Sequence, residues 1–244
     1  MDYIKTFYRF ALSNPHLLLS VLLFGSGAAV AFTTLPTLAG ALIGGGASLL
    51  GAWISDLNTR RQQLEKRKSL EADAKSFARP ELYRTIEKLL HIHSRALVNY
   101  NIWHQVEVMK KPNVFTDTGD VKVDFVPFLP VLYPNFENMK NLPSEELYAL
   151  IRYYDSLYSI KEHITNWWDR EGQLKTNIYN GILQNAHQSL DFALKCLEIF
   201  ELDDSIPPRY SGWKPLRERI ERENSIYTTT MDRVLKQADK KSPS

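Results

Sequence analysis

The hydrophobic positions of this chain follow two patterns. An unbroken apolar run lies near the N-terminus, and helix-spaced apolar residues alternate with charged ones in the remainder. From Phe10 to Ser55 there are 46 consecutive residues without Asp, Glu, Lys or Arg. A bilayer core about 30 Å thick needs roughly 20 apolar residues of α-helix. The run is therefore long enough for two membrane spans, which we place at about 15–34 and 36–54.

Local signals mark the ends of both spans. Asn14 can cap a helix whose first residue is Pro15, and residues 33–37, with Pro36 among them, supply a turn. Lys5 and Arg9 precede the first span, a basic cluster follows the second, and the turn carries no charge. The positive-inside rule then places both termini of this multi-pass protein in the cytoplasm.

The basic cluster after the second span has five members: Arg60, Arg61, Lys66, Arg67 and Lys68. Such a cluster is the usual cytoplasmic flank of a membrane helix and attracts anionic head groups, so the lipid bilayer is the expected partner. A nucleic-acid patch is the alternative interpretation. The net charge of the chain is only +2, and no direct nucleic-acid binding is expected. The single cysteine, Cys196, excludes an intrachain disulfide and suits a reducing compartment.

A cleaved signal peptide is the rival interpretation of the N-terminus. Lys5 and Arg9 would form its charged region, and Ala29-Val30-Ala31 would be an A-x-A cleavage site. That charged region would be long, and a second apolar segment begins a few residues later. Both observations favour a membrane hairpin.

Small residues line one face of the second span. Gly40, Gly44, Ser48 and Gly51 recur at helical spacing and would let another helix approach closely. This face either packs the two arms of the hairpin together or mediates oligomerisation in the membrane. Three adjacent glycines, residues 44–46, are more than one contact within the hairpin needs, and a homo-oligomer is expected.

The remaining chain reads as helical, so the expected fold class is all-α: an N-terminal two-helix transmembrane hairpin plus a cytosolic helical bundle with one long loop. We expect a membrane anchor at 1–55, juxtamembrane and first cytosolic helices at 56–111, an ordered loop at 112–142, the helical bundle at 143–238 and a tail at 239–244. Pro80 should restart or kink the first cytosolic helix. The alternating residues 121–125 indicate one small strand or hairpin in the loop.

Three stripes of helical spacing are predicted to form the core of the bundle. The first is Leu82, Ile86, Leu89, Leu90, His93, Ala96, Leu97 and Tyr100. The second is Leu147, Leu150, Ile151, Tyr154, Leu157, Tyr158 and Ile164. The third is Ile178, Ile182, Leu183, Ala186, Leu190, Leu194 and Leu197.

No motif points to catalysis, a cofactor or a metal: there is no glycine-rich phosphate loop, Cys-x-x-Cys, H-E-x-x-H or nucleophile elbow. His91 and His93 are two residues apart and cannot chelate from one helix face. Arg84 and His91 loosely match the Arg-x(4–6)-His motif of the helical HEPN ribonucleases. Chance explains that match, because Arg9 and His16 form a second one at the start of the apolar run, where a nuclease site is implausible. Trp167-Trp168 could stack on a base, but core or membrane-interface positions are commoner for such aromatics.

Three further runs carry a resemblance: residues 130–136 (PVLYPNF), 142–147 (LPSEEL) and 151–154 (IRYY). They resemble a pattern in small bacterial membrane proteins with one or two N-terminal spans and a cytosolic helical region. The whole layout is similar to the two-span effectors encoded beside retron reverse transcriptases. The resemblance implies the bacterial inner membrane, antiphage abortive infection, and restraint by a reverse transcriptase with its RNA–DNA hybrid. It transfers no catalytic residue.

Three functions are therefore weighed. The first is a membrane effector that perturbs the inner membrane when released. The second is a passive membrane-anchored adaptor or scaffold for a cytosolic partner. The third is a membrane-tethered HEPN-like nuclease. The first is preferred, and no enzyme activity is expected.

The topology is directly testable. Because basic residues flank both ends of the apolar run, reporter fusions at the N-terminus and after Leu57 should both report a cytoplasmic location. A periplasmic signal after Leu57, or processing near Ala31, would contradict the hairpin.

Overall fold

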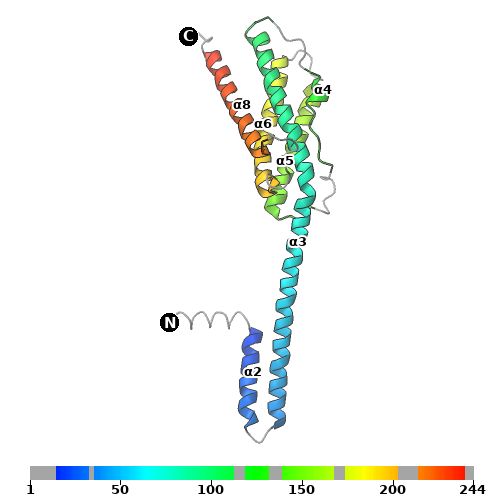
Figure 1. The fold of residues 1–244 in the computed structure, drawn as a ribbon, viewed down its shortest axis with the longest axis vertical. Coiled ribbons are helices and arrows are strands. Elements are labelled where there is room, and N and C mark those ends of the chain that lie inside the picture. The colour runs from blue at the N-terminus through cyan, green and yellow to red at the C-terminus, as the bar shows by residue number, and fades with distance from the viewer. Residues whose placement is uncertain are drawn as a thin grey trace. The chain divides into compact units, whose positions relative to one another are not determined.

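The protein is all-helical throughout the residues that the structure describes, as the sequence predicts. The computed structural model describes residues 15–32, 36–112, 119–131, 139–167, 174–202 and 214–239. Within these ranges there are helices and connecting segments and no strand (Figure 1). The chain divides into two compact units, Met1–Ser69 and Leu70–Ser244.

The first unit contains α2 (Pro15–Ala31) and the beginning of α3 (Pro36–Trp103). The two helices pack antiparallel, because residues late in α2 meet residues early in α3: Gly27 lies against Ile43, and Phe24 lies against Gly46. α2 ends at Ala31, earlier than the predicted residue 34. The predicted turn falls largely on residues 33–35, which lie outside the described part of the chain.

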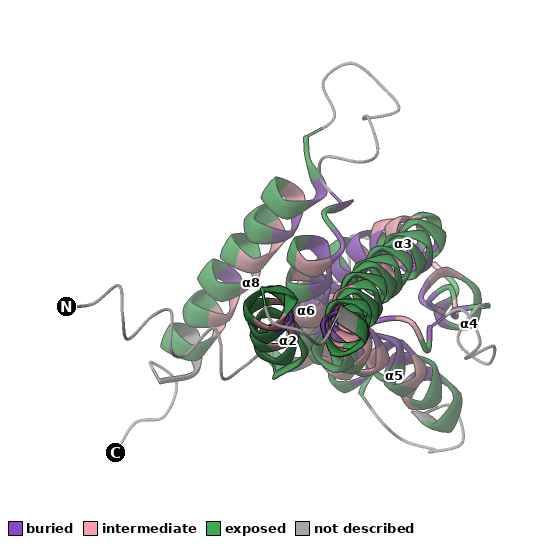
Figure 2. Ribbon diagram, turned by 90° about the horizontal axis from the view of Figure 1, so that it is seen from below, coloured by how far each residue is buried: buried purple, intermediate pink, exposed green. Residues whose placement is uncertain are grey.

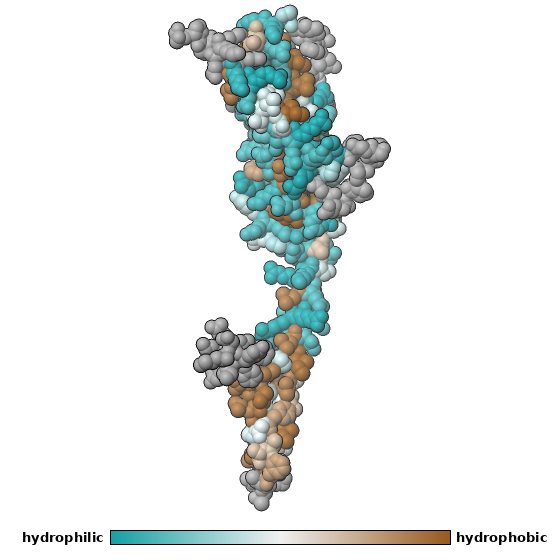
Figure 3. Space-filling model, turned by 60° about the vertical axis from the view of Figure 1, so that its left-hand side comes forward, coloured by the Kyte–Doolittle hydropathy of each residue, from teal (hydrophilic) through white to brown (hydrophobic). Residues whose placement is uncertain are grey.

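Apolar side chains cover the surface of α2 and the start of α3 (Figure 3). Leu19, Val21 and Leu22 of α2 and Leu38 of α3 are exposed. Of the described helices, the one running from Thr37 has an apolar section long enough to cross a membrane, and only 11% of that section is buried. α2 is apolar but has 17 residues, which is about 26 Å of helix.

The sequence predicts that Pro80 restarts or kinks the helix, and the restart is wrong, because α3 runs without interruption through Pro80. A proline inside a helix costs about 3 kcal/mol. Packing on both sides of it offsets that cost, because Ala78 and Leu82 are buried in the core. Arg79 adds a hydrogen bond from its Nε to the carbonyl oxygen of Phe200, at 2.8 Å.

The end of α3 also differs from the prediction. The helix was expected to reach about Lys111, but it ends at Trp103 and continues as a single π-helical turn, η1 (His104–Val108). Glu107 on this turn accepts hydrogen bonds from the backbone N–H groups of Lys175 and Thr176, at 3.0 and 2.9 Å. These are orphan donors at the start of a helix, so Glu107 acts as their cap from a distant part of the chain.

The alternating residues 121–125 form a short helix, α4 (Val121–Asp124), rather than a strand. The Asp120 side chain accepts a hydrogen bond from the N–H of Lys122 at 2.8 Å and so caps this helix. Gly119 precedes it with a φ of +77°, a conformation that glycine adopts without strain. Local capping chemistry has here overridden the strand-like alternation of the side chains.

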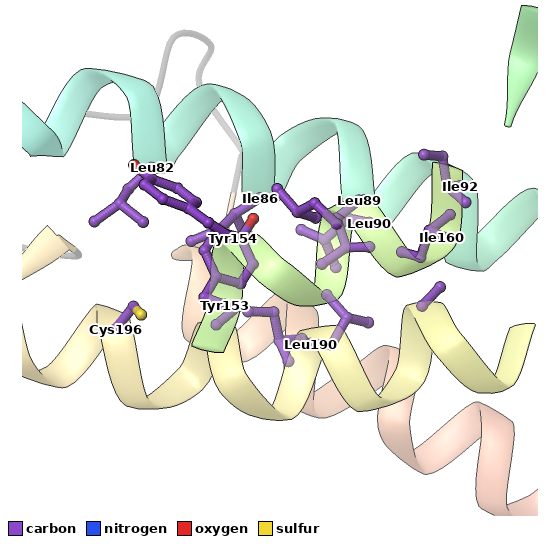
Figure 4. Packing of buried hydrophobic residues seen from close by; sticks show 14 of the residues in the cluster. Leu82, Ile86, Leu89, Leu90, Ile92, Tyr153, Tyr154, Ile160, Leu190 and Cys196 are labelled. Carbon is purple, nitrogen blue, oxygen red and sulfur yellow. The ribbon is translucent and has the colours of Figure 1, made fainter. Parts of the chain in front are cut away.

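The core of the second unit lies between the C-terminal part of α3 and the helices α5 (Ser144–Trp167), α6 (Lys175–Ile199) and α8 (Leu216–Asp239). Burial runs in stripes along these helices (Figure 2). Figure 4 shows Leu89 and Leu90 of α3 facing Ile160 of α5 and Leu190 of α6. All eight residues of the first predicted stripe are buried.

The other two predicted stripes are confirmed in most positions. Leu147, Ile151, Tyr158 and Leu194 are partly buried, and the remaining predicted residues are buried. Two of the largest fully buried side chains, Tyr153 and Ile160, were not predicted. The Tyr153 hydroxyl donates to Thr85 Oγ1 at 3.1 Å, which lets this aromatic residue occupy the core without an unsatisfied polar atom.

The core assignment predicts an asymmetry between two positions of α3. Leu89→Ala should lower the free energy of unfolding by about 2–5 kcal/mol, because it leaves a cavity in packed surroundings. Val98→Ala on the same helix should change it by less than about 0.5 kcal/mol, because Val98 is 55% exposed. Denaturant titration of the full chain in detergent, followed by labelling of the buried Cys196 thiol, compares the two. Equal effects would contradict this packing.

Candidate functional site

The four small residues predicted to associate helices lie on an open face of α3. Gly40, Gly44, Ser48 and Gly51 are all exposed. A Cβ atom added at Gly40, Gly44 or Gly51 would meet no atom of the described chain within 4 Å. Ser48 donates its hydroxyl proton to the carbonyl oxygen of Gly44 at 3.0 Å, so its polar group is satisfied within the helix. We call these four residues the glycine face.

A different set of small residues packs the hairpin. A Cβ at Gly27 would lie 2.8 Å from Ile43 Cγ1, and one at Gly46 would lie 3.0 Å from the Phe24 ring and 3.2 Å from the Ser20 carbonyl oxygen. Ser20 is fully buried, with its hydroxyl donating to the His16 carbonyl oxygen at 2.7 Å. Close approach between α2 and α3 therefore depends on Gly27 and Gly46.

These two observations bear on one of the alternatives that the sequence leaves open for the small residues of α3, namely packing within the hairpin. At 100° per residue, Gly46 lies more than a quarter of a turn from every member of the glycine face. The glycine face does not pack the two arms together. Among the described residues of the first unit it remains an uncovered surface of small residues.

The predicted basic cluster lies on the exposed surface of α3. Arg60 pairs with Asp56 at 2.8 Å and Arg61 with Glu65 at 3.1 Å, both at i,i+4 spacing. Such exposed pairs contribute little to stability. Within the described residues Lys66, Arg67 and Lys68 form no ion pair, so the net positive charge of the cluster stays on the surface.

Arg84 and His91 lie on the same side of α3, but the structure does not bring them together. They are separated by about 10 Å along the helix. The Arg84 guanidinium lies over the Phe128 ring, 5.2 Å from its centroid. It also borders a hollow of about 650 Å³ next to Phe77, Pro80 and Val131.

The surroundings of His91 disfavour its charged form. Partial burial lowers its pKa first, the neighbouring charges of Lys88 and Arg95 lower it further, and Asp124 acts in the opposite direction. Lys88 donates to the Asp124 carbonyl oxygen at 2.9 Å, and Arg95 pairs with the Asp124 carboxylate at 3.4 Å. These two cations therefore attach the segment carrying α4 to α3, which is a structural role.

The two tryptophans and the cysteine that the sequence singles out give no further candidate for a reactive or binding site. Trp167 and Trp168 have side chains outside the described part of the structure. Cys196 is fully buried, and burial raises the pKa of its thiol to about 12. It is therefore an unreactive core residue at neutral pH. Among the described residues no group of three or more His, Cys, Asp or Glu side chains could hold a metal ion.

Sequence reasoning missed a cluster of three rings at the edge of the core, where His93 is buried and His187 and Tyr227 are partly buried. His93 was correctly predicted to be buried, but His187 and Tyr227 were not connected to it. The rings of His187 and Tyr227 stack with centroids 4.0 Å apart, and each lies 5.9 Å from His93. The three residues come from α3, α6 and α8. No spacing along the chain could have indicated their meeting, because more than 90 residues separate His93 from His187.

Comparisons with known proteins add no assignment. A scan against protein-family models, a search of curated proteins and a search of solved structures each found no match to this chain. The functional argument therefore depends on the geometry described above.

The separation of Arg84 from His91 generates a test of the nuclease alternative. The double substitution Arg84→Ala with His91→Ala should leave cellular RNA intact and any growth defect of the overexpressing host unchanged, because Arg84 packs on the Phe128 ring and lies about 10 Å from His91 along the helix. Quantitative blotting must show normal abundance of the variant. Loss of the growth defect at normal abundance would favour the nuclease.

Proposed function

We propose that the protein is a membrane effector of a bacterial antiphage system, which perturbs the inner membrane through association of its N-terminal helices. In this proposal residues 15–34 and 36–54 span the bilayer as a hairpin with both termini in the cytoplasm, and the second unit is cytosolic. The observation that carries the proposal is the open glycine face of α3.

The physical argument begins with the environment of the first unit. Its exposed surface is rich in Leu, Val and Ile, which lipid solvates well and water does not. In lipid no hydrophobic force drives helices together, so association depends on close packing. The glycine face offers such packing, because no described residue covers Gly40, Gly44 or Gly51.

The need for assembly of several copies distinguishes an effector from a passive anchor. An anchor needs only to insert, and the hairpin contacts at Gly27 and Gly46 suffice for a compact inserted unit. A membrane lesion needs helices from several copies in contact. The glycine face of one copy can meet that of another, whereas the basic cluster of each copy would stay at the cytoplasmic surface.

Control of the effector is the second part of the proposal. By resemblance to the retron-associated effectors, a reverse transcriptase with its RNA–DNA hybrid would restrain the protein until infection. The second unit is the part available to such a partner in the cytoplasm.

The glycine face generates the decisive prediction for function. Gly44→Leu keeps the span apolar, so insertion and abundance should be normal. The added side chain enters open space within one copy but blocks backbone approach by a second copy. We expect depolarisation of the host membrane, measured with a potential-sensitive dye on overexpression, to fall at least about tenfold, since one such block removes more than the roughly 1 kcal/mol of a typical contact.

Two matched substitutions control this experiment. Gly25→Leu makes the same change on α2, where a Cβ also meets nothing within 4 Å, and should leave depolarisation near the wild-type level. Gly46→Leu should disrupt the hairpin itself and reduce the amount of protein in the membrane. Undiminished depolarisation by a normally inserted Gly44→Leu protein would remove the assembly mechanism and leave the adaptor function.

A further inference from the structure

The surface of the second unit contains a hollow of about 650 Å³, lined by side chains within residues 73–84 of α3 and by Val131. We call it the Pro80 hollow. Phe77, Pro80 and Val131 give it an apolar lining, and Phe77 and Val131 are 48% and 71% exposed. Binding sites of this volume are commonly apolar with a few polar groups. Because its apolar walls are open to solvent, the Pro80 hollow suits a chain segment lying across it better than an enclosed small molecule.

Two contacts hold the non-helical wall of the Pro80 hollow in place. Glu81 of α3 is only 8% exposed, and its Oε2 accepts a hydrogen bond from the backbone N–H of Val131 at 3.0 Å. Three residues earlier in that segment, the Phe128 ring lies under the Arg84 guanidinium, 5.2 Å from it. The hollow is therefore formed before any ligand arrives, which reduces the ordering cost of binding.

Pro80 leaves a hydrogen-bond acceptor at the edge of the hollow. Proline has no backbone N–H, so the helical bond that residue 80 would donate to the carbonyl oxygen of Ser76 is missing. Ser76 and Pro80 both line the hollow, and both are exposed. A ligand that covers this carbonyl oxygen must supply a donor in place of water, and a peptide backbone carries one N–H per residue.

Charges of opposite sign mark the two ends of the Pro80 hollow. Asp73 and Arg84 both line it and lie eleven positions apart, which is about 16 Å along the helix. Neither forms an ion pair with another residue in the described ranges. Lys88 adds a second cation at the Arg84 end, with its Nζ 5.6 Å from the Phe128 centroid. One end therefore attracts an anionic group and the other a cationic group.

We infer that the Pro80 hollow docks an extended segment of a partner protein. An apolar side chain of the segment lies on Phe77 and Pro80, an acidic side chain faces Arg84, and a basic side chain faces Asp73. An extended chain advances about 3.3 Å per residue, so about five residues cover the 16 Å between the charged ends. A backbone N–H of the segment donates to the carbonyl oxygen of Ser76.

The charges of the hollow favour a peptide over a nucleic acid. Asp73 and Glu81 line the same surface as Arg84, and both carboxylates would repel a phosphate backbone. The inference does not rest on the proposed membrane activity, because an effector and an adaptor both need a surface for a cytosolic partner. Docking here would concern control of the chain, so it is compatible with unchanged activity of an Arg84→Ala chain that is overexpressed alone.

Photocrosslinking with a defined peptide tests the site. The probe is the blocked pentapeptide Lys-Ala-Bpa-Ala-Glu, in which Bpa is benzoylphenylalanine and its irradiated ketone attaches to nearby C–H bonds. With the full chain in detergent micelles, mass spectrometry should locate the label on Phe77, Pro80 or Val131. A large excess of Lys-Ala-Leu-Ala-Glu should reduce this labelling. Label spread over the surface, or labelling that the competitor does not reduce, would overturn the proposal.

A charge exchange tests the role of Arg84. Arg84→Glu should reduce labelling by the acidic-ended probe at least about fivefold and increase labelling by Lys-Ala-Bpa-Ala-Lys, because the sign of the charge at this end is reversed. Arg84 is exposed, so the substitution leaves the core of the bundle intact. An Arg84→Glu chain with the wild-type preference between the two probes would contradict docking by charge complementarity.

Two substitutions on α3 form a matched pair. Phe77→Ser removes apolar surface from the hollow and should abolish most of the labelling. Val98→Ser changes a residue of similar exposure, 55% against 48%, outside the lining and should leave labelling at the wild-type level. Equal labelling of the two variants would overturn the site. Labelling that falls as the protein concentration rises, at a constant ratio of probe to protein, would mean that a second copy fills the hollow and would exclude a separate partner.

Discussion

The organisation of this chain depends on the cost of keeping an uncharged apolar stretch in water. Residues 10–55 contain no charged side chain, and the helices that they form expose most of their Leu, Val and Ile side chains. Among the described residues of the first unit, no core forms that is large enough to bury these side chains. A bilayer solvates them, and helices satisfy their own backbone hydrogen bonds there. The charged residues that begin at Asp56 then mark the level at which α3 would return to water.

Glycine has two separate uses in the first unit. At Gly27 and Gly46 it allows the backbones of α2 and α3 to approach so closely that a Cβ would collide with the partner helix. At Gly40 and Gly44 it leaves an uncovered surface. The first use makes the hairpin compact, and the second provides the surface through which we propose that copies associate. This division gives the proposed effector a physical mechanism for assembly without any catalytic group.

Periodicity along the sequence predicted the parts of the fold that depend on local spacing. The stripe from Leu82 to Tyr100 is buried as predicted. Apolar residues spaced three to four apart lie on one face of a helix, and that face packs into the core. The strand predicted at residues 121–125 was wrong, because the cap from Asp120 favoured a helical turn. Continuity through Pro80 could not be predicted, since it depends on packing partners distant in sequence.

The candidate sites also divide into those that residue spacing predicted and those that only the structure shows. The glycine face was predicted from its four-residue spacing, but which small residues face α2 required the structure. The His93–His187–Tyr227 cluster had no sequence signal, because three helices bring it together. The Arg84–His91 pair had a signal, but the structure places Arg84 over Phe128 instead. Residue spacing along one helix predicted which residues share a face. It gave no signal for contacts between residues of different helices.

Disulfide crosslinking between copies tests most directly whether the glycine face associates. In a Cys196→Ser background the chain has no other thiol. Ser48→Cys places one on the glycine face, and Ser26→Cys places one at an exposed position of α2. Mild oxidation of intact membranes should produce a covalent dimer from Ser48→Cys and little or none from Ser26→Cys. Absence of the dimer from Ser48→Cys, or equal dimer from both variants, would contradict association through this face.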